Sequence, residues 1–482
     1  MQRPMSLHKR SGCRDFLLER PFSGGHRLGG LRTRAAVVLA FLALLPAGEA
    51  GAGWKAGAGT RCITPGETMW MAGYGSRDRP AEGTLSELWA KALVLEDDSG
   101  DRTVLITLDL VGIDATLSAR VKSRIERGYG LGRERVALCA SHTHSGPVAG
   151  HNLASMFVLD DAEQRKVAGY VVFLEQRIGE AVDQAMEGLE PAEVAWEEGF
   201  AGFAVNRRNN PEAEIRLRRT AGALLGPVDH SVPVLRMTSE GRIRALVFGY
   251  ACHATVLSSY QWSGDYPGFA QMALEERYPG AAALFWAGCG ADLNPLPRRQ
   301  VELARHYGKM LAASVAEVVE GPMQELGGSI QAGFEETALP FARIPARKEL
   351  EEQVAGEDRF EVNRARLLLE RLDREGELAE SYPYPVQAWR LGDGPLWLFL
   401  GGEVVVDYAL RFKRDFGHRG VWATAYANDV MAYIPSERVL REGGYEGGGA
   451  MVFYGLPSPW QEGVEERIVH AVRRQAIRVG GR

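Results

Sequence analysis

The sequence predicts a mixed α/β protein with a largely parallel sheet core, flanking helices and a single large domain. Two apolar runs, residues 104–113 and 135–144, bracket the helix-like segment 114–130. A strand, helix, strand order of this kind predicts a parallel crossover unit. The same order recurs in ALVFGYACHAT, PGFAQMALEERY and AAALFWAGCG, which follow one another between residues 245 and 290. Two such units favour an α/β core.

The rest of the chain adds further helices and strands to this core. A helix is expected over residues 297–325, and a charge-rich helical segment from about residue 345 to 380. We interpret the second segment as a solvated helix or helical pair that covers an edge of the core, inserted within the domain. Strands are expected at PLWLFLGGEVV and VWATAYAN, and the glycine-rich loop REGGYEGGGA follows them.

Composition limits the classes of partner. The 482 residues are 45% hydrophobic, which is enough for one large core or two moderate ones. The formal net charge of −6 provides no basic surface for phosphate groups, so no nucleic-acid partner is expected. Cys139, Cys252 and Cys289 lie in apolar runs without CxxC spacing, which favours buried free thiols over disulfides.

The first fifty residues contain the clearest targeting signal. Arg32 and Arg34 precede an apolar run, residues 35–45, that is followed by small residues. This run is too short to span a bilayer and is typical of a secretory leader. We therefore expect residues 1–50 to be a signal peptide and residues 51–482 to be an exported domain, periplasmic or secreted. An uncleaved membrane anchor and a buried N-terminal helix are the alternatives.

Two histidines follow one of the predicted strands. SHTHSGP places His142 and His144 just past an apolar run. Their side chains would face opposite sides of an ideal strand, but the backbone bends where a strand ends, so both can reach one cavity. Histidines in such a setting need a metal or hydrogen bonds to offset burial. A histidine pair in a surface turn is the alternative.

Three further candidates end or follow apolar runs. His253 lies in ACHAT, Glu403 closes LWLFLGGEVVV, and Tyr433 lies in NDVMAYIPSE. A carboxylate in an apolar strand must be paired, protonated or metal-bound. A lone histidine or tyrosine in such a position is more often a core residue, so the residues alone leave both interpretations open. No HExxH or CxxC spacing is present, and any metal site must be assembled by the fold.

The order of five segments adds a resemblance to a known family. SHTHSGP, ACHAT followed by SGDYPG, GCGADLNP, GGE and NDVMAYIPSERVLREGGYEGG occur in this order. They resemble the motifs THTHSGP, a histidine followed by SGDNKG, GDVSPN, a GE pair and YITTxEEYxxQxYEG of the neutral, non-lysosomal ceramidases. The resemblance covers roughly residues 55–475, and five motifs in one order are far more specific than any single one.

This resemblance implies a zinc amidase with one Zn²⁺ per chain. The metal ligands implied by the matching motifs are His142, His253, Glu403 and Tyr433. His144 would lie near the bound water or substrate, acting as general base and later protonating the leaving amine. Arg207 in VNRR and Tyr445 in GGYEGG would contact the amide or donate to the developing oxyanion.

The implied reaction is hydrolysis of an N-acyl amide bond, with ceramide split into a sphingoid base and a fatty acid. The partner would be a lipid-like or other N-acyl substrate. This substrate class is compatible with peripheral contact between the protein and a membrane, and the oligomeric state is left open. An exported zinc hydrolase of a carbohydrate- or peptide-linked amide or ester is one alternative. A non-catalytic family member is the other.

The chain departs from the family pattern at several points. GCGADLNP carries Asn294 near the position of the serine in GDVSPN, which disfavours a covalent serine mechanism. SGDYPG replaces SGDNKG, and we expect the C-terminal immunoglobulin-like domain of the family to be absent. Asp265 and Asp292 are candidate partners that orient the histidines, with turn capping as the alternative.

Overall fold

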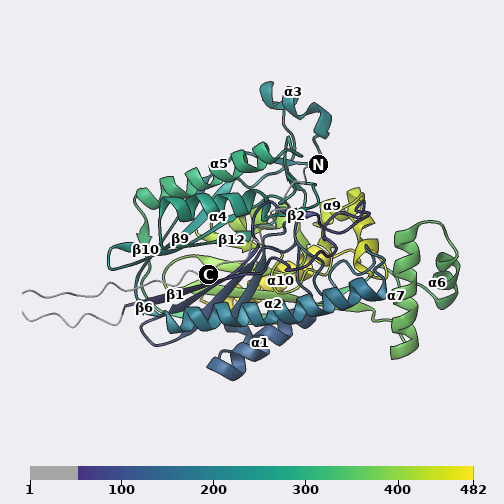
Figure 1. The fold of residues 1–482 in the computed structure, drawn as a ribbon, viewed down its shortest axis with the longest axis horizontal. Helices are drawn as coiled ribbons and strands as arrows, with labels where there is room; N and C mark the ends of the chain where they lie inside the picture. Colours follow the sequence, from purple (N-terminus) through teal and green to yellow (C-terminus); the bar gives the residue numbers. More distant parts are fainter. Residues whose placement is uncertain (1–52, 481–482) are drawn as a thin grey trace, which may run out of the picture. The chain divides into compact units, whose positions relative to one another are not determined.

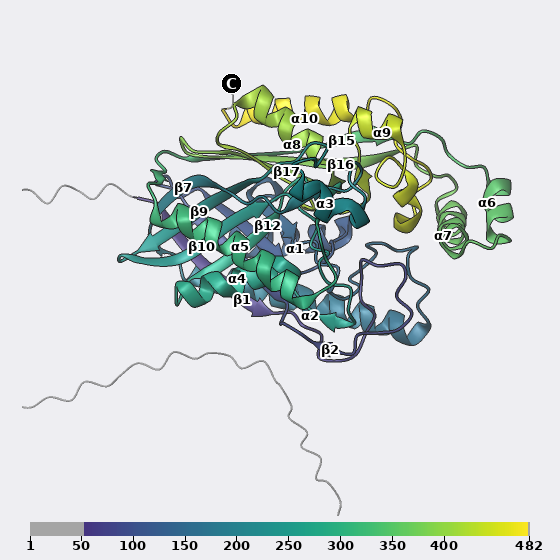
Figure 2. The same ribbon diagram turned by 90° about the horizontal axis from the view of Figure 1, so that it is seen from above.

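The computed structural model describes residues 53–480, which belong to one compact unit. The predicted leader, residues 1–50, lies outside the described residues. Within the described range, three larger sheets and three short strand pairs are surrounded by helices (Figure 1, Figure 2). The predicted mixed α/β class is therefore confirmed.

The first sheet has the strand order β5-β4-β3-β1-β6. Its strands are β1 (Lys55–Cys62), β3 (Trp89–Glu96), β4 (Arg102–Leu108), β5 (Val136–Ala140) and β6 (Glu190–Pro191). Strands β4 and β5 are parallel, and helix α1 (Ala115–Tyr129) connects them. The first predicted crossover unit is confirmed.

The second sheet has the order β12-β10-β9-β7-β14. Its strands are β7 (Glu193–Phe200), β9 (Ser231–Ser239), β10 (Arg242–Tyr250), β12 (Ala282–Ala287) and β14 (Gln324–Glu325). Strands β10 and β12 are parallel, and α4 (Asp265–Arg277) lies between them in the chain. This is the second predicted crossover unit.

The third sheet has the order β15-β16-β17-β19, and three two-stranded pairs complete the architecture. Its strands are β15 (Ile330–Pro340), β16 (Ser381–Leu391), β17 (Leu396–Leu400) and β19 (Val421–Thr424). The short pairs are β2 (Gly83–Thr84) with β11 (Gln261–Trp262), β8 (Ala204–Asn206) with β13 (Leu293–Pro295), and β18 (Glu403–Val404) with β20 (Tyr433–Ile434).

The sheets are less parallel than the sequence predicts. Each of the three larger sheets contains one parallel pair, namely β4–β5, β10–β12 or β17–β19, and its other pairs are antiparallel. The physical reason lies in the connections, because β3–β4, β9–β10 and β16–β17 are joined by short turns that reverse the chain. The sequence pattern showed the crossovers clearly but not the hairpins.

The inner faces of the second and third sheets meet in an aromatic cluster. Trp286 of β12, Trp397 of β17 and Trp422 of β19 are buried, and their ring centroids lie 5.2–6.4 Å apart. Such contacts between large rings stabilise a core beyond the burial of their area. Buried residues of the first sheet, among them Leu93 and Leu105, belong to the same hydrophobic cluster. Strand ends from all three sheets can therefore supply one site.

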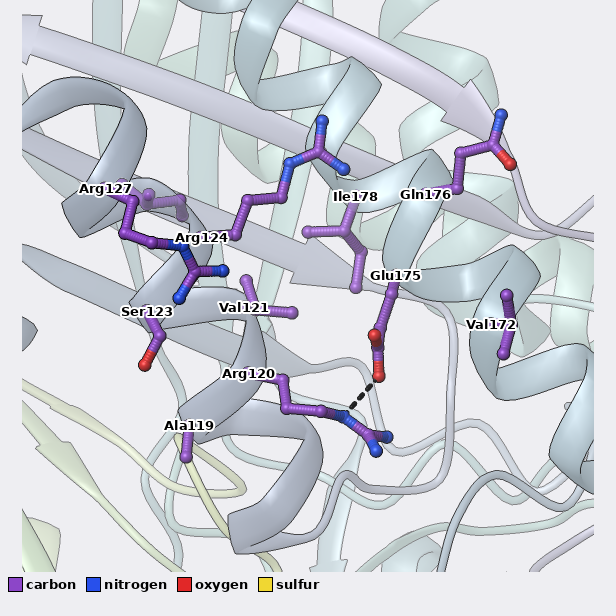
Figure 3. A pocket seen from close by; sticks show the side chains of 12 residues that line it. Ala119, Arg120, Val121, Ser123, Arg124, Arg127, Val172, Glu175, Gln176 and Ile178 are labelled. Atoms are coloured by element: carbon purple, nitrogen blue, oxygen red, sulfur yellow. Dashed lines mark ion pairs between the residues drawn. The ribbon is translucent and has the colours of Figure 1, made fainter.

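Helices cover the outer faces. The remaining helices are α2 (Asp161–Glu187), α3 (Ile215–Thr220), α5 (Val301–Glu320), α6 (Arg347–Val354), α7 (Arg359–Glu375), α8 (Val406–Phe416), α9 (Glu437–Glu442) and α10 (Val464–Arg478). Helix α5 confirms the helix predicted over residues 297–325. Helices α1 and α2 lie side by side, and Arg120 Nε is 2.6 Å from Glu175 Oε1 in the hollow between them (Figure 3).

The charged segment near residues 345–380 forms the helical pair α6 and α7, as expected. Its helices share a small core of their own, made by Leu350, Ala365 and Leu368. The pair packs on the main core through the Phe360 ring of α7, which lies 4.8 Å from that of Phe453 in the turn at residues 449–454.

Two further expectations concern the described residues. Cys139, Cys252 and Cys289 are buried free thiols, which confirms the prediction for these three. In the part of the chain that the structure describes, no helix combines the length and apolarity needed to cross a membrane.

Close packing of α2 on β1 depends on two glycines. A β-carbon at Gly57 or Gly59 would lie 2.1 Å or 2.0 Å from a carbonyl oxygen of α2, that of Ala185 or Ala181. Both contacts are much shorter than a van der Waals separation, so only glycine permits this approach.

We predict that Gly59→Val destabilises the fold by about 1–3 kcal/mol or more, because the helix must move away from the strand. Ala58→Val is the matched control, since this partly buried neighbour points to the opposite face, away from α2. Urea unfolding of both variants measures the difference. Equal stability of the two variants would show that α2 can shift away from β1 without a loss of folding free energy, and would contradict the prediction.

Candidate active site

The predicted site residues converge from strand ends of different sheets. His142 follows β5, and His253 follows β10. Glu403 and Tyr433 begin β18 and β20 and lie directly opposite one another in that parallel pair. The two histidine segments are joined by a bridge between Thr143 and Ala254. Side chains from segments about 290 residues apart in the sequence therefore share one buried space.

A left-handed backbone turn brings His142 and His144 to the same cavity. His142 has φ of 60°, which is rare for a residue with a β-carbon. This turn breaks the strand alternation, so the two Nε2 atoms lie 3.0 Å apart. Tyr426, which also has a positive φ, stacks on the His142 ring at 4.2 Å. The predicted bend at the strand end is confirmed, and the surface-turn alternative is wrong because both rings are buried.

Backbone carbonyls fix the tautomers of two histidines. His142 Nδ1 lies 2.6 Å from Val111 O, and His253 Nδ1 lies 2.9 Å from Gly290 O. A carbonyl oxygen only accepts, so each Nδ1 carries a proton and donates it. Each Nε2 of the neutral ring therefore presents a lone pair to the centre. Burial lowers the pKa of His253 to about 4, which favours this neutral form.

Glu403 faces the same two nitrogens. Its Oε2 lies 3.2 Å from Nε2 of both His142 and His253 and has no hydrogen-bond donor among the described residues. Burial alone would raise the pKa of Glu403, and His142 and His253 lower it only when they are protonated, an effect that a bound cation would reproduce. The other oxygen, Oε1, accepts a short hydrogen bond from the Tyr454 hydroxyl. Three buried lone pairs thus point at one spot without a proton between them.

This donor set fits a metal ion. Two imidazole nitrogens with a carboxylate are a common ligand set for catalytic zinc, and their second nitrogens are oriented by hydrogen bonds. His144 is close enough that the ligand atoms of His142, His144 and His253 all lie within 4.8 Å of one another. The buried and otherwise unpartnered Glu403 Oε2 is the observation that a cation would explain.

Tyr433 and Arg207 close another side of the centre. The Tyr433 hydroxyl lies 3.3 Å from His253 Nε2 and accepts a hydrogen bond from Arg207 Nη2 at 3.1 Å. Arg207 also donates to Glu446 Oε1 at 2.7 Å and to Asn294 Oδ1 at 3.3 Å. Burial would lower the pKa of Arg207, but Tyr433 and Glu446 hold it well above its ordinary value. A fixed positive charge therefore lies beside the tyrosine oxygen.

Tyr445 lies at the rim of the site. Its side chain is 45% exposed, and its ring is 5.2 Å from that of Tyr433. The Arg207 guanidinium carbon is 5.6 Å from the Tyr445 ring centroid. All seven predicted site residues are thus brought together, with six inside and Tyr445 at the edge.

Sequence reasoning missed several residues that support the site. Tyr454 holds Glu403, Glu446 holds Arg207, and Tyr74 packs its ring 4.8 Å from that of His144. A β-carbon at Gly73, which has a φ of 96°, would lie 2.5 Å from Cγ of His144. The sequence contains one feature that could have identified Glu446, because it is the single charged residue within the glycine-rich run 443–449. The aromatic residues gave none.

Asp265 and Asp292 do not orient the histidines. Asp265 accepts from the backbone of Leu257 and Tyr266, and Asp292 accepts from the backbone of Val406. At His142 and His253, backbone carbonyls orient the rings, which is the role that we expected of the two aspartates. The turn-capping alternative fits Asp265, whereas Asp292 accepts from the Val406 backbone and the Asn206 side chain, both distant in the sequence. Burial raises the pKa of each aspartate to about 6.

The fold and the site define a mixed α/β protein with a buried centre whose donors fit a metal ion. Residues 54–312 match the family model described as neutral/alkaline non-lysosomal ceramidase, N-terminal. This match covers more than half of the chain, and the chain belongs to that family. It includes His142 and His253 but ends before Glu403 and Tyr433.

Individual relatives are consistent with this membership. The chain is 26% identical over 302 residues to the neutral ceramidase of Pseudomonas aeruginosa, with 58% of this chain and 43% of the relative covered. It is 27% identical over 278 residues to the neutral ceramidase of Drosophila pseudoobscura pseudoobscura, covering 53% and 38%. The chain thus spans less than half the length of these curated relatives.

A solved structure extends the likeness beyond the family match. The crystal structure of neutral ceramidase from Pseudomonas aeruginosa superposes with a TM-score of 0.67 at 20% identity. It covers 88% of this chain and 74% of the other. A structure described as ceramidase complexed with C2 gives a TM-score of 0.65 at 19% identity, with 88% and 76% covered. The shared fold thus continues past residue 312.

The Tyr454 hydroxyl is expected to orient Glu403 for metal binding. We predict that Tyr454→Phe lowers the affinity of the centre for a metal ion, measured with Zn²⁺, by roughly ten- to a hundredfold while the fold is retained. Tyr170→Phe is the control, because this buried hydroxyl donates to Ile63 O at 2.8 Å and not to a residue of the site. Competition with a zinc chelator gives both affinities. Unchanged zinc affinity in Tyr454→Phe would mean that Glu403 needs no such support.

Proposed function

We propose that this protein is a zinc-dependent hydrolase of an N-acyl amide bond, with ceramide as the substrate. The observation that carries the proposal is the convergence of His142 Nε2, His253 Nε2 and Glu403 Oε2 on one buried spot. Family membership supports the reaction, since the relatives are named neutral ceramidases. The reaction would release a fatty acid and a sphingoid base.

The proposed zinc ligands are His142, His253, Glu403 and Tyr433. When bound, zinc would acidify a water molecule and polarise the acyl oxygen. The positive charge of Arg207, 3.1 Å from the Tyr433 oxygen, favours electron density on that oxygen and so its role as a ligand. This ligand set leaves His144 for chemistry.

His144 is proposed to move the proton. Burial, followed by the neighbouring His142 and His253, holds the pKa of His144 well below its ordinary value. The neutral ring can accept a proton from the attacking water and return it to the leaving nitrogen. Its position is fixed by Gly73 on one face and by the Tyr74 ring. A base held in this way loses little entropy during reaction.

Arg207 and Tyr445 are proposed to bind the acyl oxygen as negative charge develops. Glu446 and Asn294 fix the guanidinium, so its orientation need not change during the reaction. Tyr445 approaches from the exposed rim, where a substrate would enter. Asn294 acts here by holding Arg207, which agrees with the absence of a serine nucleophile.

We also propose that the protein acts after export, on the evidence of the apolar run at residues 35–45. Export would place the enzyme where lipid or other N-acyl substrates outside the cytoplasm are accessible. N-terminal sequencing of the protein recovered from outside the cytoplasm would identify the cleavage site.

The roles of ligand and base are separable by mutation. We predict that His253→Ala loses both zinc and activity, because one of the metal ligands is removed. His144→Gln should retain zinc but lose activity by about 10²–10⁴-fold, because proton transfer is lost. His151→Ala, at an exposed histidine, is the control and should behave as wild type. Metal analysis and release of fatty acid from a fluorescent N-acyl sphingosine measure both quantities.

The same assay distinguishes the alternatives. The protein could bind zinc and release no fatty acid, yet hydrolyse a carbohydrate- or peptide-linked amide or ester. That result would show that its substrate is not ceramide. Bound zinc and no turnover of any of these substrates would indicate a non-catalytic member. Wild-type protein that takes up no zinc would refute the ligand assignment.

A further inference from the structure

A protruding loop begins immediately after the active-site arginine. We call residues 211–226 the arginine–leucine loop; it contains the short turn Glu212–Glu214 and helix α3. Figure 1 shows α3 projecting away from the sheets, beyond α5. The loop begins four residues after Arg207, so its base lies at the active site.

The base of this loop is fixed by apolar packing and by side-chain hydrogen bonds. Ile215 is buried against Val205 and Leu296 in a small separate core. The Asn210 side chain donates to Leu225 O at 2.7 Å and accepts from Leu225 N at 3.0 Å, which closes the loop. The exposed part is therefore held in a defined position rather than hanging free.

The exposed part carries large apolar side chains. Leu217, Leu224 and Leu225 are 74%, 36% and 57% exposed, so three of the eleven exposed large hydrophobic residues in the described range fall within nine residues. The intervening Ala221 and Ala223 are exposed too. Scattered exposed leucines are ordinary, but three within one short exposed segment favour an interaction surface.

Arginines surround these leucines. The loop contains Arg216, Arg218 and Arg219, and Arg298 and Arg299 reach it from the segment before α5. Its two acids are already paired, Glu214 with Arg218 at 2.8 Å and Glu212 with Arg298 and Arg299 at 3.1 Å and 3.3 Å. Five arginines against two glutamates leave a charge of +3, in a chain whose formal net charge is −6.

We propose that the arginine–leucine loop docks this protein on an anionic lipid bilayer. Leucines at the tip would enter the boundary between headgroups and acyl chains, and the arginines would contact lipid phosphates. The choice of a bilayer over a protein partner rests on the proposed function, because a lipid substrate resides in a membrane. Positive charge concentrated on one loop of an acidic protein matches a negatively charged surface.

Docking at this loop would bring the active site to the membrane. Arg208, at the base of the loop, donates to Glu446 Oε2 at 2.7 Å and to Glu442 Oε2 at 3.0 Å. These acids flank Tyr445, so the loop and the exposed rim of the site are joined by ion pairs. A lipid leaving the bilayer beside the loop would then have a short path to the centre.

Vesicle sedimentation with the full mature chain, residues 51–482, tests this proposal. Wild type should bind phosphatidylcholine vesicles that contain phosphatidylglycerol and bind pure phosphatidylcholine more weakly. Leu217→Ser/Leu225→Ser and Arg216→Glu should each weaken binding about tenfold, since they remove apolar insertion or reverse a charge. The matched controls on α10, Ile477→Ser and Arg467→Glu, alter an exposed apolar residue and an exposed arginine and should bind as wild type.

A soluble short-chain N-acyl sphingosine separates docking from catalysis. All four variants should hydrolyse it at the wild-type rate, while the two loop variants lose activity on ceramide in vesicles. Vesicle binding that is equal in wild type and loop variants would overturn the proposal. So would self-association of wild type without vesicle binding, abolished by Leu217→Ser/Leu225→Ser, because it would identify a protein interface. Failure of short-chain hydrolysis in wild type would contradict the proposed function and leave the binding result to stand alone.

Discussion

Two backbone hydrogen bonds determine what the centre of this protein can be. The carbonyls of Val111 and Gly290 accept from Nδ1 of His142 and His253, and this fixes both rings with their lone pairs facing Glu403. Without these bonds each ring could rotate or change tautomer, and a direct hydrogen bond to the carboxylate would satisfy the site. With them, the buried carboxylate oxygen finds no proton donor among the described residues, and the centre could hold a cation.

The packing of the three sheets brings distant parts of the chain to this centre. The hydrophobic cluster around the tryptophans includes buried residues of all three sheets, so strand ends from different sheets meet. Gly402, with a φ of 73°, then turns the chain sharply after β17, and a β-carbon there would lie 2.6 Å from Ile434. That turn aligns Glu403 with Tyr433 in a pair of only two residues per strand. Such a short pair is an unusual element of structure but an effective way to position two side chains.

Sequence patterns predicted the parts of the fold that depend on local order. The two crossover units and the charged helical pair are visible because apolar periodicity and charge repeat within short segments. The antiparallel majority was missed because hairpin partners share no periodicity that distinguishes them from crossover strands. Within the site, the positive φ of His142 follows from a bend that the strand end made foreseeable. Tyr454 and Tyr74 could not be foreseen, since their roles depend on contacts across 51 and 70 residues with nothing local to mark them.

Arg207 connects the buried centre to the surface. Its guanidinium bonds to Tyr433 within the centre and to Glu446 beside the exposed Tyr445, while the chain continues directly into the arginine–leucine loop. Arg208 binds the same carboxylate, so Glu446 joins both arginines through separate oxygens. A movement of the arginine–leucine loop would therefore be transmitted to Arg207, which contacts Tyr433. This arrangement explains why a glycine-rich segment carries one buried glutamate. The surrounding glycines let the backbone turn tightly, and the glutamate ties that turn to Arg207 at the centre and to Arg208 at the base of the arginine–leucine loop.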